Sequence, residues 1–455
     1  MREMRILLVE PGFPNRFPPL GLLKIGSYHL EKGDEVTFTK GLWPKARGFF
    51  FDRIYISTLF SFHHSLTVRT ILHYKDLLKG DLRRLFVGGI HATLNSMAIF
   101  NETGVFPHVG LLNRPGILGN DHVVIDALSP AYGLLETADY SYDLKDAYFG
   151  YSTRGCPNRC KFCAVPMLEP TFVDYIDLKP YIASIVAKYG EKQHLVLMDN
   201  NVLASGRFPQ IISDIRSLGF EQGAKRLGKK RTVDFNQGLD ANRINPQTAR
   251  LLSEICIEPF RLAYDSPREF RGFERAVRVL EGFGQKKLST YVLYNFSDTP
   301  LDLYTRLSHV IDLNAALGTH IYSFPMRYTP LDARDRKYVG PSWTAKHIRG
   351  LQCILNVTKG LVSHRQDFFY RAFGNDYSEF EQILLMPDRY ILNRLKHENN
   401  GALDWRTTFK KLTPSQKDTL LSTINSNDKG AILKAINSSR SFRMKSLLGH
   451  HLEKR

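Results

Sequence analysis

The sequence predicts an α/β protein with a doubly wound, Rossmann-like N-terminal domain, a partial (β/α)6 barrel and a mostly helical C-terminal region. Two regions in which strand and helix signals alternate predict the first two parts, since that rhythm is typical of parallel sheets. Strand signals fade after about residue 341, which predicts the mostly helical C-terminal region. A chain of 455 residues is too long for one ordinary core, so several domains are expected. We place them at 1–135, 148–335 and 341–455, with a linker at 136–147.

The first domain should consist of short apolar strands that alternate with helices. The first helix is expected to run from Leu20 to Lys32 and to end at Gly33, because glycine readily adopts the conformation that follows a helix end. A second helix near His64–Leu78 should end at Gly80. The predicted strands are Arg5–Glu10, Glu35–Thr39, Arg53–Leu59 and the stretch Leu85–Val87 that leads into Gly88-Gly89.

The second domain repeats a strand–helix unit six times. Pro180 and Pro246 suit the first turns of helices, Asn245 suits a cap, and Gly190, Gly219 and Gly284 suit helix ends. Six such units form an incomplete barrel that is open on one side, and the chemistry of such barrels lies at the carboxyl ends of the strands. The predicted strands are Tyr148–Ser152, His194–Asp199, Thr232–Asn236, Phe260–Tyr264, Leu288–Tyr294 and His320–Phe324.

The C-terminal region is expected to be helical, for instance over Thr344–Leu355 and Pro414–Ile424. It holds 19 Lys and Arg against 10 Asp and Glu, whereas the whole chain has a formal charge of +17. Such an excess favours acidic partners such as nucleic acid, although a generally basic surface that keeps the protein soluble explains it equally well. The run 225–231, with five basic residues, is interpreted as a solvated loop.

The composition is that of a soluble globular protein, with 43% hydrophobic and 24% charged residues. No stretch approaches the roughly 18 apolar residues of a membrane span. The apolar run at the N-terminus is too short for a signal peptide, so a cytoplasmic location is expected. Five cysteines do not make a disulfide framework in a chain of this size. Three of them fall within eight residues, which indicates a metal site.

The three clustered cysteines, Cys156, Cys160 and Cys163, follow the first strand of the predicted barrel. A cubane iron–sulfur cluster is held by thiolates, and three of them leave the fourth iron without a protein ligand. Structural zinc prefers four ligands in paired groups, and no second Cys or His pair has a suitable spacing. Basic residues in the loop favour the thiolate form of the cysteines. Cys256 and Cys353 are interpreted as buried side chains.

The spacing Cys-x3-Cys-x2-Cys, with the aromatic Phe162 before the last cysteine, resembles the signature of the radical S-adenosylmethionine (SAM) superfamily. The resemblance covers the whole predicted barrel. It implies a [4Fe-4S] cluster whose open iron is chelated by SAM, and one-electron cleavage of SAM to methionine and a 5′-deoxyadenosyl radical that abstracts hydrogen from the substrate. It also implies an electron donor such as flavodoxin or ferredoxin, and a small-molecule or peptide substrate.

Polar residues at the other strand ends match this superfamily less closely. Asp199-Asn200 ends the second strand, where relatives bind the SAM amino group, but the common Gly-Gly-Glu is absent here. The resemblance implies that Gln237 and Arg243 lie near SAM after the third strand, with Arg243 paired to its carboxylate. It places Asp265-Ser266 at the ribose and Asn295 near the adenine. Each of these residues also suits a helix cap or a turn.

The N-terminal domain resembles the cobalamin-binding-type domain that precedes many radical SAM barrels, through the segments 18–22, 33–36 and 87–93. Glycines after a strand let a cofactor approach the backbone closely. The chain lacks Asp-x-His-x-x-Gly, so no histidine is marked as a cobalt ligand, and His63, His64 and His91 are interpreted as surface or loop residues. The sequence leaves cobalamin open. Its presence would favour methyl transfer, and its absence oxidation, cyclisation or rearrangement.

Two alternatives to a radical SAM enzyme with a small substrate stay open. The first is a radical SAM enzyme that modifies RNA, and the second is a non-catalytic iron–sulfur or zinc protein. A methylthiotransferase would need a second cysteine triad in its N-terminal domain, and residues 1–147 contain no cysteine.

Overall fold

The computed structural model describes residues 3–426 and 428–452. The chain divides into two compact units, and the division falls between the third and fourth strands of the predicted barrel. The first unit comprises Met1–Leu239, Gln247–Pro259 and Thr329–Tyr338, and the second comprises Asp240–Pro246, Phe260–Tyr328 and Val339–Arg455.

The N-terminal part of the first unit is built on a parallel sheet with the strand order β2-β1-β3-β4. Its strands begin where the sequence predicts them and end within two residues of the predicted ends. They are β1 (Arg5–Glu10), β2 (Glu35–Lys40), β3 (Arg53–Thr58) and β4 (Leu85–Gly89).

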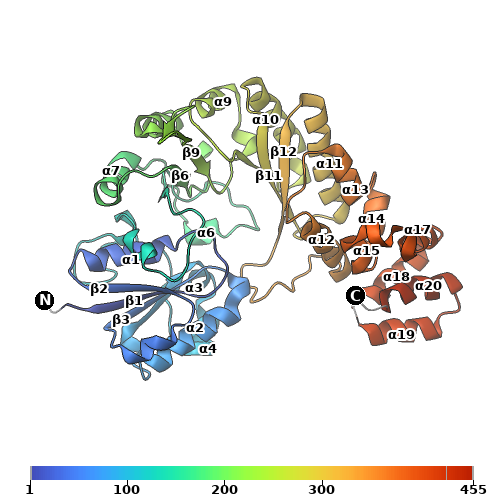
Figure 1. Ribbon diagram of the computed structural model, residues 1–455, viewed down its shortest axis with the longest axis horizontal. Coiled ribbons are helices and arrows are strands. Elements are labelled where there is room, and N and C mark those ends of the chain that lie inside the picture. The colour runs from blue at the N-terminus through green and yellow to red at the C-terminus, as the bar shows by residue number, and fades with distance from the viewer. Residues whose placement is uncertain (1–2, 427, 453–455) are drawn as a thin grey trace. The chain divides into compact units, whose positions relative to one another are not determined.

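Alternate residues of β1 point to opposite faces of this sheet, and each face is covered by a helix (Figure 1). Ile6 and Leu8 pack with buried residues of α1 (Leu20–Leu30), whereas Leu7 and Val9 pack with those of α2 (His64–Leu77). Both faces of a parallel sheet must be covered in this way, which explains why the interior residues of β1 are apolar and buried. Short helices complete this part of the unit: α3 (Ile90–Leu94), α4 (Ser96–Thr103) and α5 (Gly133–Glu136).

The strand order has a topological switch point between β1 and β3. From β1 the chain passes to β2 on one side, and the later strands β3 and β4 lie on the other side. The connections that leave β1 and β3 therefore run in opposite directions, and in open α/β folds ligands bind at the carboxyl edge of the sheet at such a point.

The first three strands of the predicted barrel form a parallel sheet of the order β5-β6-β9 in the first unit. Helices accompany these strands, and Gly190 and Gly219 have the positive φ of 71° and 80° expected at the ends of helical segments. The elements are β5 (Ala147–Gly150), α6 (Val165–Leu168), α7 (Leu178–Tyr189), β6 (His194–Leu197), α8 (Phe208–Ile215), β9 (Thr232–Phe235) and α9 (Pro246–Ser253).

The basic run 225–231 is largely exposed, as predicted, but it forms a β-hairpin and not an irregular loop. The strands β7 (Lys225–Arg226) and β8 (Lys229–Lys230) pair antiparallel around a two-residue turn. Arg226 forms ion pairs with Asp146 and Glu191. The buried guanidinium of Arg231 lies 3.9 Å from the centre of the Phe220 ring. Pairing with acidic and aromatic neighbours gives this run a structural role.

The last three strands form the parallel sheet β10-β11-β12 of the second unit. The backbone pairing of the six predicted strands thus lies in two sheets of three strands. The elements are β10 (Arg261–Ala263), α10 (Phe270–Gly282), β11 (Lys287–Tyr294), α11 (Pro300–Leu317) and β12 (His320–Arg327).

The C-terminal region of the second unit is helical, as predicted, and Figure 1 shows its helices at the red end of the chain. One large cluster of buried apolar side chains, including Trp405, Phe369 and Leu447, joins these helices to β11 and α11. None of the helices in the described residues has the length and apolar character needed to cross a membrane. The helices are α12 (Ala345–Val357), α13 (Gln366–Phe373), α14 (Tyr377–Leu385), α15 (Asp388–Leu392), α16 (Arg394–His397), α17 (Leu403–Lys410), α18 (Pro414–Asn425), α19 (Lys429–Ser438) and α20 (Phe442–Leu452).

Candidate functional site

The three clustered cysteines lie in the loop between β5 and α6. Cys156 and Cys163 are half-buried, and Cys160 is exposed. The backbone N–H of Val165 lies 3.4 Å from the sulfur of Cys163, and the amide of Asn201 lies 3.6 Å from the sulfur of Cys156. In residues 3–426 and 428–452, no three His, Cys, Asp or Glu side chains converge as ligands of a single metal ion.

The ends of the cysteine loop are fastened to each other. Arg154 and Val173 exchange two backbone hydrogen bonds of 3.1 and 2.8 Å in an antiparallel bridge. Glu169, at the end of α6, accepts hydrogen bonds from the backbone N–H of Gly155 at 2.6 Å and from the Asn200 amide at 2.8 Å. Its other oxygen lies 2.7 Å from the Arg154 guanidinium. The loop that carries the cysteines is therefore closed at its neck before any ligand binds.

Gly155 is required at this neck. Its φ is +71°, and a Cβ atom at this position would lie 2.5 Å from the carbonyl oxygen of Thr171 and 3.0 Å from that of Glu169. Any side chain would push the two ends of the loop apart. The tight passage explains why a glycine precedes the first cysteine.

The neck is also connected to the N-terminal sheet domain of the same unit. Arg154 donates a 2.8 Å hydrogen bond to Asp126, and Asp126 also pairs with the buried ammonium of Lys24 on α1 at 3.2 Å. Burial lowers the pKa of Lys24, and the charge of Asp126 opposes that shift. The Arg154 guanidinium stacks 4.0 Å from the centre of the Tyr151 ring. A chain of charges thus joins α1 to the residue that opens the cysteine loop.

Asp199 is fully engaged with the backbone that leads into the loop. Its buried carboxylate accepts hydrogen bonds from the backbone N–H and hydroxyl groups of both Ser152 and Thr153, at distances of 2.5–3.2 Å. Burial raises the pKa of Asp199, and these hydrogen bonds oppose the shift. Asn200 and Asn201, which follow it, are the residues of this strand end that reach Glu169 and Cys156.

Of the residues after β9, Gln237 belongs to the first unit and Arg243 to the second. Gln237 is exposed, and its amide donates to the neighbouring Asn236 at 3.3 Å. Arg243 lies 3.4 Å from the carboxylate of Asp240, which also caps the turn Ala241–Arg243. Within the second unit, this turn contacts α10.

Asp265 and Ser266 follow β10 in the second unit, where they begin a short helical turn. Ser266 caps that turn, and Glu269 closes the capping box by accepting from the backbone N–H groups of Asp265 and Ser266 at 2.7 and 3.2 Å. Burial, followed by the neighbouring charge of Glu269, raises the pKa of Asp265 to about 7. The charge of Asp240 adds to this shift, so three carboxyl groups influence one another at this strand end.

Asn295 ends β11 with a φ of 69°, a left-handed conformation that asparagine tolerates. Its buried side chain donates to the carbonyl of Tyr328 at 3.1 Å and accepts from the backbone N–H of Gly340 at 2.7 Å. A Cβ atom on Gly340 would lie 2.7 Å from the Asn295 carbonyl oxygen. Asn295 therefore holds the two ends of the segment 328–340 together.

At the switch point of the N-terminal sheet, aromatic side chains from two loops meet. Phe13, after β1, lies 5.5 Å from Phe60 and stacks at 6.0 Å on His63, both of which follow β3. Phe62 stacks on Phe60 at 5.0 Å. We call Phe13, Phe60, Phe62 and His63 the switch-point aromatic cluster. It lies at the edge of the sheet where ligands of this fold class bind.

His64 and His91 are buried, so their interpretation as surface or loop residues was wrong. Their rings are joined by a 3.0 Å hydrogen bond, and the other nitrogen of His64 lies 2.9 Å from Glu102. Burial lowers the pKa of His91 to about 4. Glu102 also pairs with Arg334 at 2.7 Å, and Asn95 donates to the carbonyl of Leu331 at 2.8 Å. The histidines thus help to fasten the segment 329–338 to the N-terminal domain.

Comparisons with known proteins give a fold. No family model matches the chain, and no curated protein matches it in sequence. Its structure is similar to that of the radical S-adenosylmethionine methyltransferase TsrM from Kitasatospora setae, solved with tryptophan substrate and the SAM analog aza-SAM bound. The TM-score is 0.52 and the sequence identity 13%, and the match covers 77% of this chain and 76% of that chain. The chain shares the overall fold of that protein. The predicted α/β fold class, with a Rossmann-like N-terminal domain followed by parallel strand–helix units and a helical C-terminal region, is confirmed.

A second structure of the same methyltransferase, with cobalamin and a [4Fe-4S] cluster bound, has a TM-score of 0.49 at 14% identity and covers 73% of this chain and 77% of that chain. Sequence reasoning missed Glu169, Asp126 and Lys24. Only the position of Glu169 near the end of the cysteine loop offered a signal, because a loop needs a group that closes it.

Proposed function

We propose that this chain is a radical SAM enzyme that holds a [4Fe-4S] cluster on Cys156, Cys160 and Cys163. The observation that carries the proposal is the closed neck of the cysteine loop at the end of the first strand of a radical SAM fold. A cubane places each thiolate on a different iron, so three cysteines leave one iron open. When bound, the cluster would bind SAM at that iron and supply the electron for its reductive cleavage.

The chain's own groups fit this role. The Asn201 amide and the Val165 N–H point at the sulfurs of Cys156 and Cys163. Hydrogen bonds to cluster sulfurs offset negative charge and raise the reduction potential. Arg154 and Glu169 hold the loop in shape, which lowers the entropy lost when the cluster binds.

For SAM itself, we propose contacts from the residues that the superfamily resemblance indicates. Phe162, Asn200 and Gln237 lie in the first unit with the cysteines, and Asn200 is held by Glu169. We assign Asp199 a supporting role, because its carboxylate already accepts four donor groups. Contacts of SAM with Arg243, Asp265, Ser266 and Asn295 stay predictions.

We further propose that the reaction is a methyl transfer that depends on cobalamin bound to the N-terminal domain. The switch-point aromatic cluster lies at the carboxyl edge of the N-terminal sheet, where cofactors bind in open α/β folds. The related methyltransferase has been solved with cobalamin and with tryptophan. The tryptophan complex supports a small-molecule substrate. We also propose that the electrons come from a flavodoxin or ferredoxin.

Anaerobic reconstitution tests the proposal. Purified chain is incubated with iron, sulfide, dithionite and SAM, and the products are separated chromatographically. A radical SAM enzyme should release 5′-deoxyadenosine or, when it transfers the SAM methyl group, S-adenosylhomocysteine. Reconstitution with hydroxocobalamin should add a corrinoid absorption band that stays with the protein.

Two cysteine variants provide the control. Cys160→Ala should abolish the iron–sulfur absorption band and both products. Cys256→Ala, which removes a buried thiol outside the loop, should leave them unchanged. Failure of the wild-type protein to bind iron would refute the cluster, and iron binding without either product would refute the enzyme.

A further inference from the structure

The end of the helical region carries a basic surface that the proposed chemistry does not use. Residues 429–452 contain five Lys and Arg and no Asp or Glu. They form α19 and α20, whose buried side chains, among them Ile432 and Leu447, are apolar. The charged side chains of these helices therefore lie on the outside.

Two further basic residues join this surface from α17. Arg443, in the first turn of α20, donates a 3.4 Å hydrogen bond to the carbonyl of Lys411, at the end of α17. This contact places the two helix ends side by side (Figure 1). We define the α17–α20 basic face as the exposed side chains that gather there: Lys410, Lys411, Arg440, Phe442, Arg443 and Lys445.

The charges of this face have no acidic partner among residues 3–426 and 428–452. Among the described residues, no ion pair links any of its five basic side chains to a carboxylate, whereas Arg349 and Lys346 of the same unit both pair with Asp388. Phe442, which belongs to the same face, is 85% exposed. An exposed aromatic ring among unpaired cations costs solvation energy and electrostatic repulsion, which a ligand would relieve.

We propose that the α17–α20 basic face binds single-stranded nucleic acid. Lysine and arginine side chains contact successive phosphates and release their counterions. An aromatic ring between them provides a platform on which a base stacks, whatever its identity. The face combines both elements, and the binding does not depend on the cysteine loop.

An anionic membrane fits this face less well. A helix that lies on a membrane presents a row of apolar side chains to the lipid. On α20, however, Met444, Leu447 and Leu448 are buried in the core, and only Phe442 is presented to solvent.

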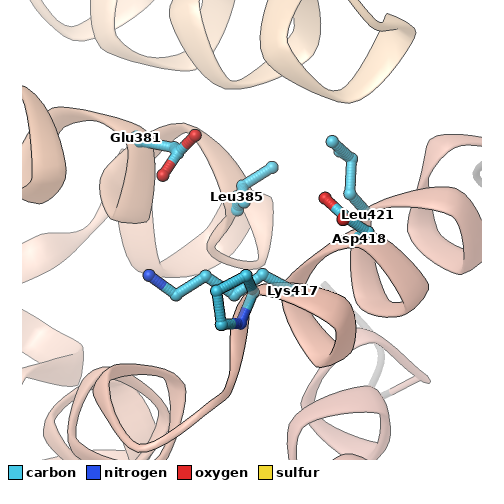
Figure 2. A pocket seen from close by; sticks show the side chains of 6 residues that line it. Glu381, Leu385, Lys417, Asp418 and Leu421 are labelled. Atoms are coloured by element: carbon cyan, nitrogen blue, oxygen red, sulfur yellow. The ribbon is translucent and has the colours of Figure 1, made fainter.

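An acidic peptide also fits less well, because peptides are recognised through pockets for their side chains. A cleft of about 210 Å³ lies between α14 and α18, and α18 begins shortly after Lys411 in the sequence. The cleft carries carboxylates of its own. Figure 2 shows Glu381 and Asp418 at this cleft with Lys417. Two carboxylates there would repel acidic side chains.

Binding is tested by fluorescence anisotropy with the full chain and a labelled oligouridylate of about 16 nucleotides. Five phosphate contacts predict a slope of about −3.5 for the logarithm of the binding constant against the logarithm of salt concentration. The variant Lys411→Gln/Arg443→Gln should reduce the slope to about −2. Phe442→Ala should weaken binding about fivefold or more at an unchanged slope.

A matched control distinguishes binding at this face from a general effect of the chain's positive charge. Arg371→Gln/Lys396→Gln removes two exposed charges elsewhere in the helical region and should leave the affinity within twofold. The proposal is overturned if the oligonucleotide does not bind, or if both double variants weaken binding equally. A third outcome would also overturn the proposal and assign the face to a membrane: the chain binds phosphatidylserine vesicles but not the oligonucleotide, and Lys411→Gln/Arg443→Gln abolishes the vesicle binding. Because no cluster is reconstituted, these outcomes are independent of the proposed enzyme activity.

Discussion

The carboxylate of Glu169 accepts a 2.6 Å hydrogen bond from the backbone N–H of Gly155, so the residue that ends α6 holds the residue before the first cysteine. The same carboxylate pairs with Arg154 and Asn200. One half-buried acidic side chain therefore shapes the loop that should carry the cluster, although it is not itself among the predicted ligands.

Replacing Glu169 with Gln should weaken cluster binding without unfolding the chain. The amide loses the charge opposite Arg154, and its NH2 group faces a donor. Groups that support metal ligands typically contribute a factor of about 10 to 100 in affinity. We expect iron and sulfide retention at limiting iron to fall accordingly, measured after anaerobic reconstitution. Glu191→Gln, which removes an exposed partner of Arg226, should retain wild-type iron. Equal iron content in both variants would contradict a role for Glu169.

Asp199→Asn should destabilise the first unit by about 2–4 kcal/mol. The amide cannot accept hydrogen bonds from all four donor groups of Ser152 and Thr153, so some of these donors stay buried without a partner. Urea denaturation followed by circular dichroism measures the change. Asp177→Asn is the control: this exposed residue caps α7, and asparagine caps a helix about as well as aspartate. A loss below about 0.5 kcal/mol for Asp199→Asn would show that its buried hydrogen bonds are dispensable.

Gly89→Ala should destabilise the N-terminal sheet domain by about 3 kcal/mol or more. Its φ is +104°, and the added Cβ would strike the backbone of Thr58. Gly110→Ala is a control that distinguishes backbone strain from a steric clash of the Cβ atom. Gly110 has a φ of +95° but open space around its Cβ position. That control should cost only the about 1–2 kcal/mol of a left-handed alanine. Thermal unfolding compares the two variants, and equal melting temperatures would rule out the collision.

Asp265 should make stability depend on pH. Burial, with the charge of Glu269, raises its pKa from 3.8 to about 7 in the folded chain. The fold thus favours the protonated form of the Asp265 carboxyl group. The stability that this preference contributes is complete below about pH 4 and is lost as the pH rises to about 7, by at most about 1.4 kcal/mol per pH unit. Asp265→Asn removes the titration and should gain stability relative to the wild type between pH 5 and pH 8.

Urea denaturation at both pH values measures this difference. Asp404→Asn, on the exposed face of α17 in the same unit, should change in parallel with the wild type. If Asp265→Asn also runs parallel to the wild type, the carboxyl group of Asp265 ionises as it does in the unfolded chain.

The sequence by itself determined the strands, the fold class and the cysteine motif. Strands such as β1, with residues Arg5–Glu10, were predictable because apolar patterning and glycine stops are local features of the chain. The spacing of Cys156, Cys160 and Cys163 is equally local.

Only the tertiary structure decided which polar side chains support the loop and which histidines are buried. Lys24 meets Asp126 across 102 positions, and Arg154 meets Asp126 across 28. His64 and His91, separated by 27 positions, become a buried pair only when α2 and α3 pack together. No local pattern encodes such pairs, because a polar side chain looks the same in sequence whether its partner is water or a charge brought to it by folding.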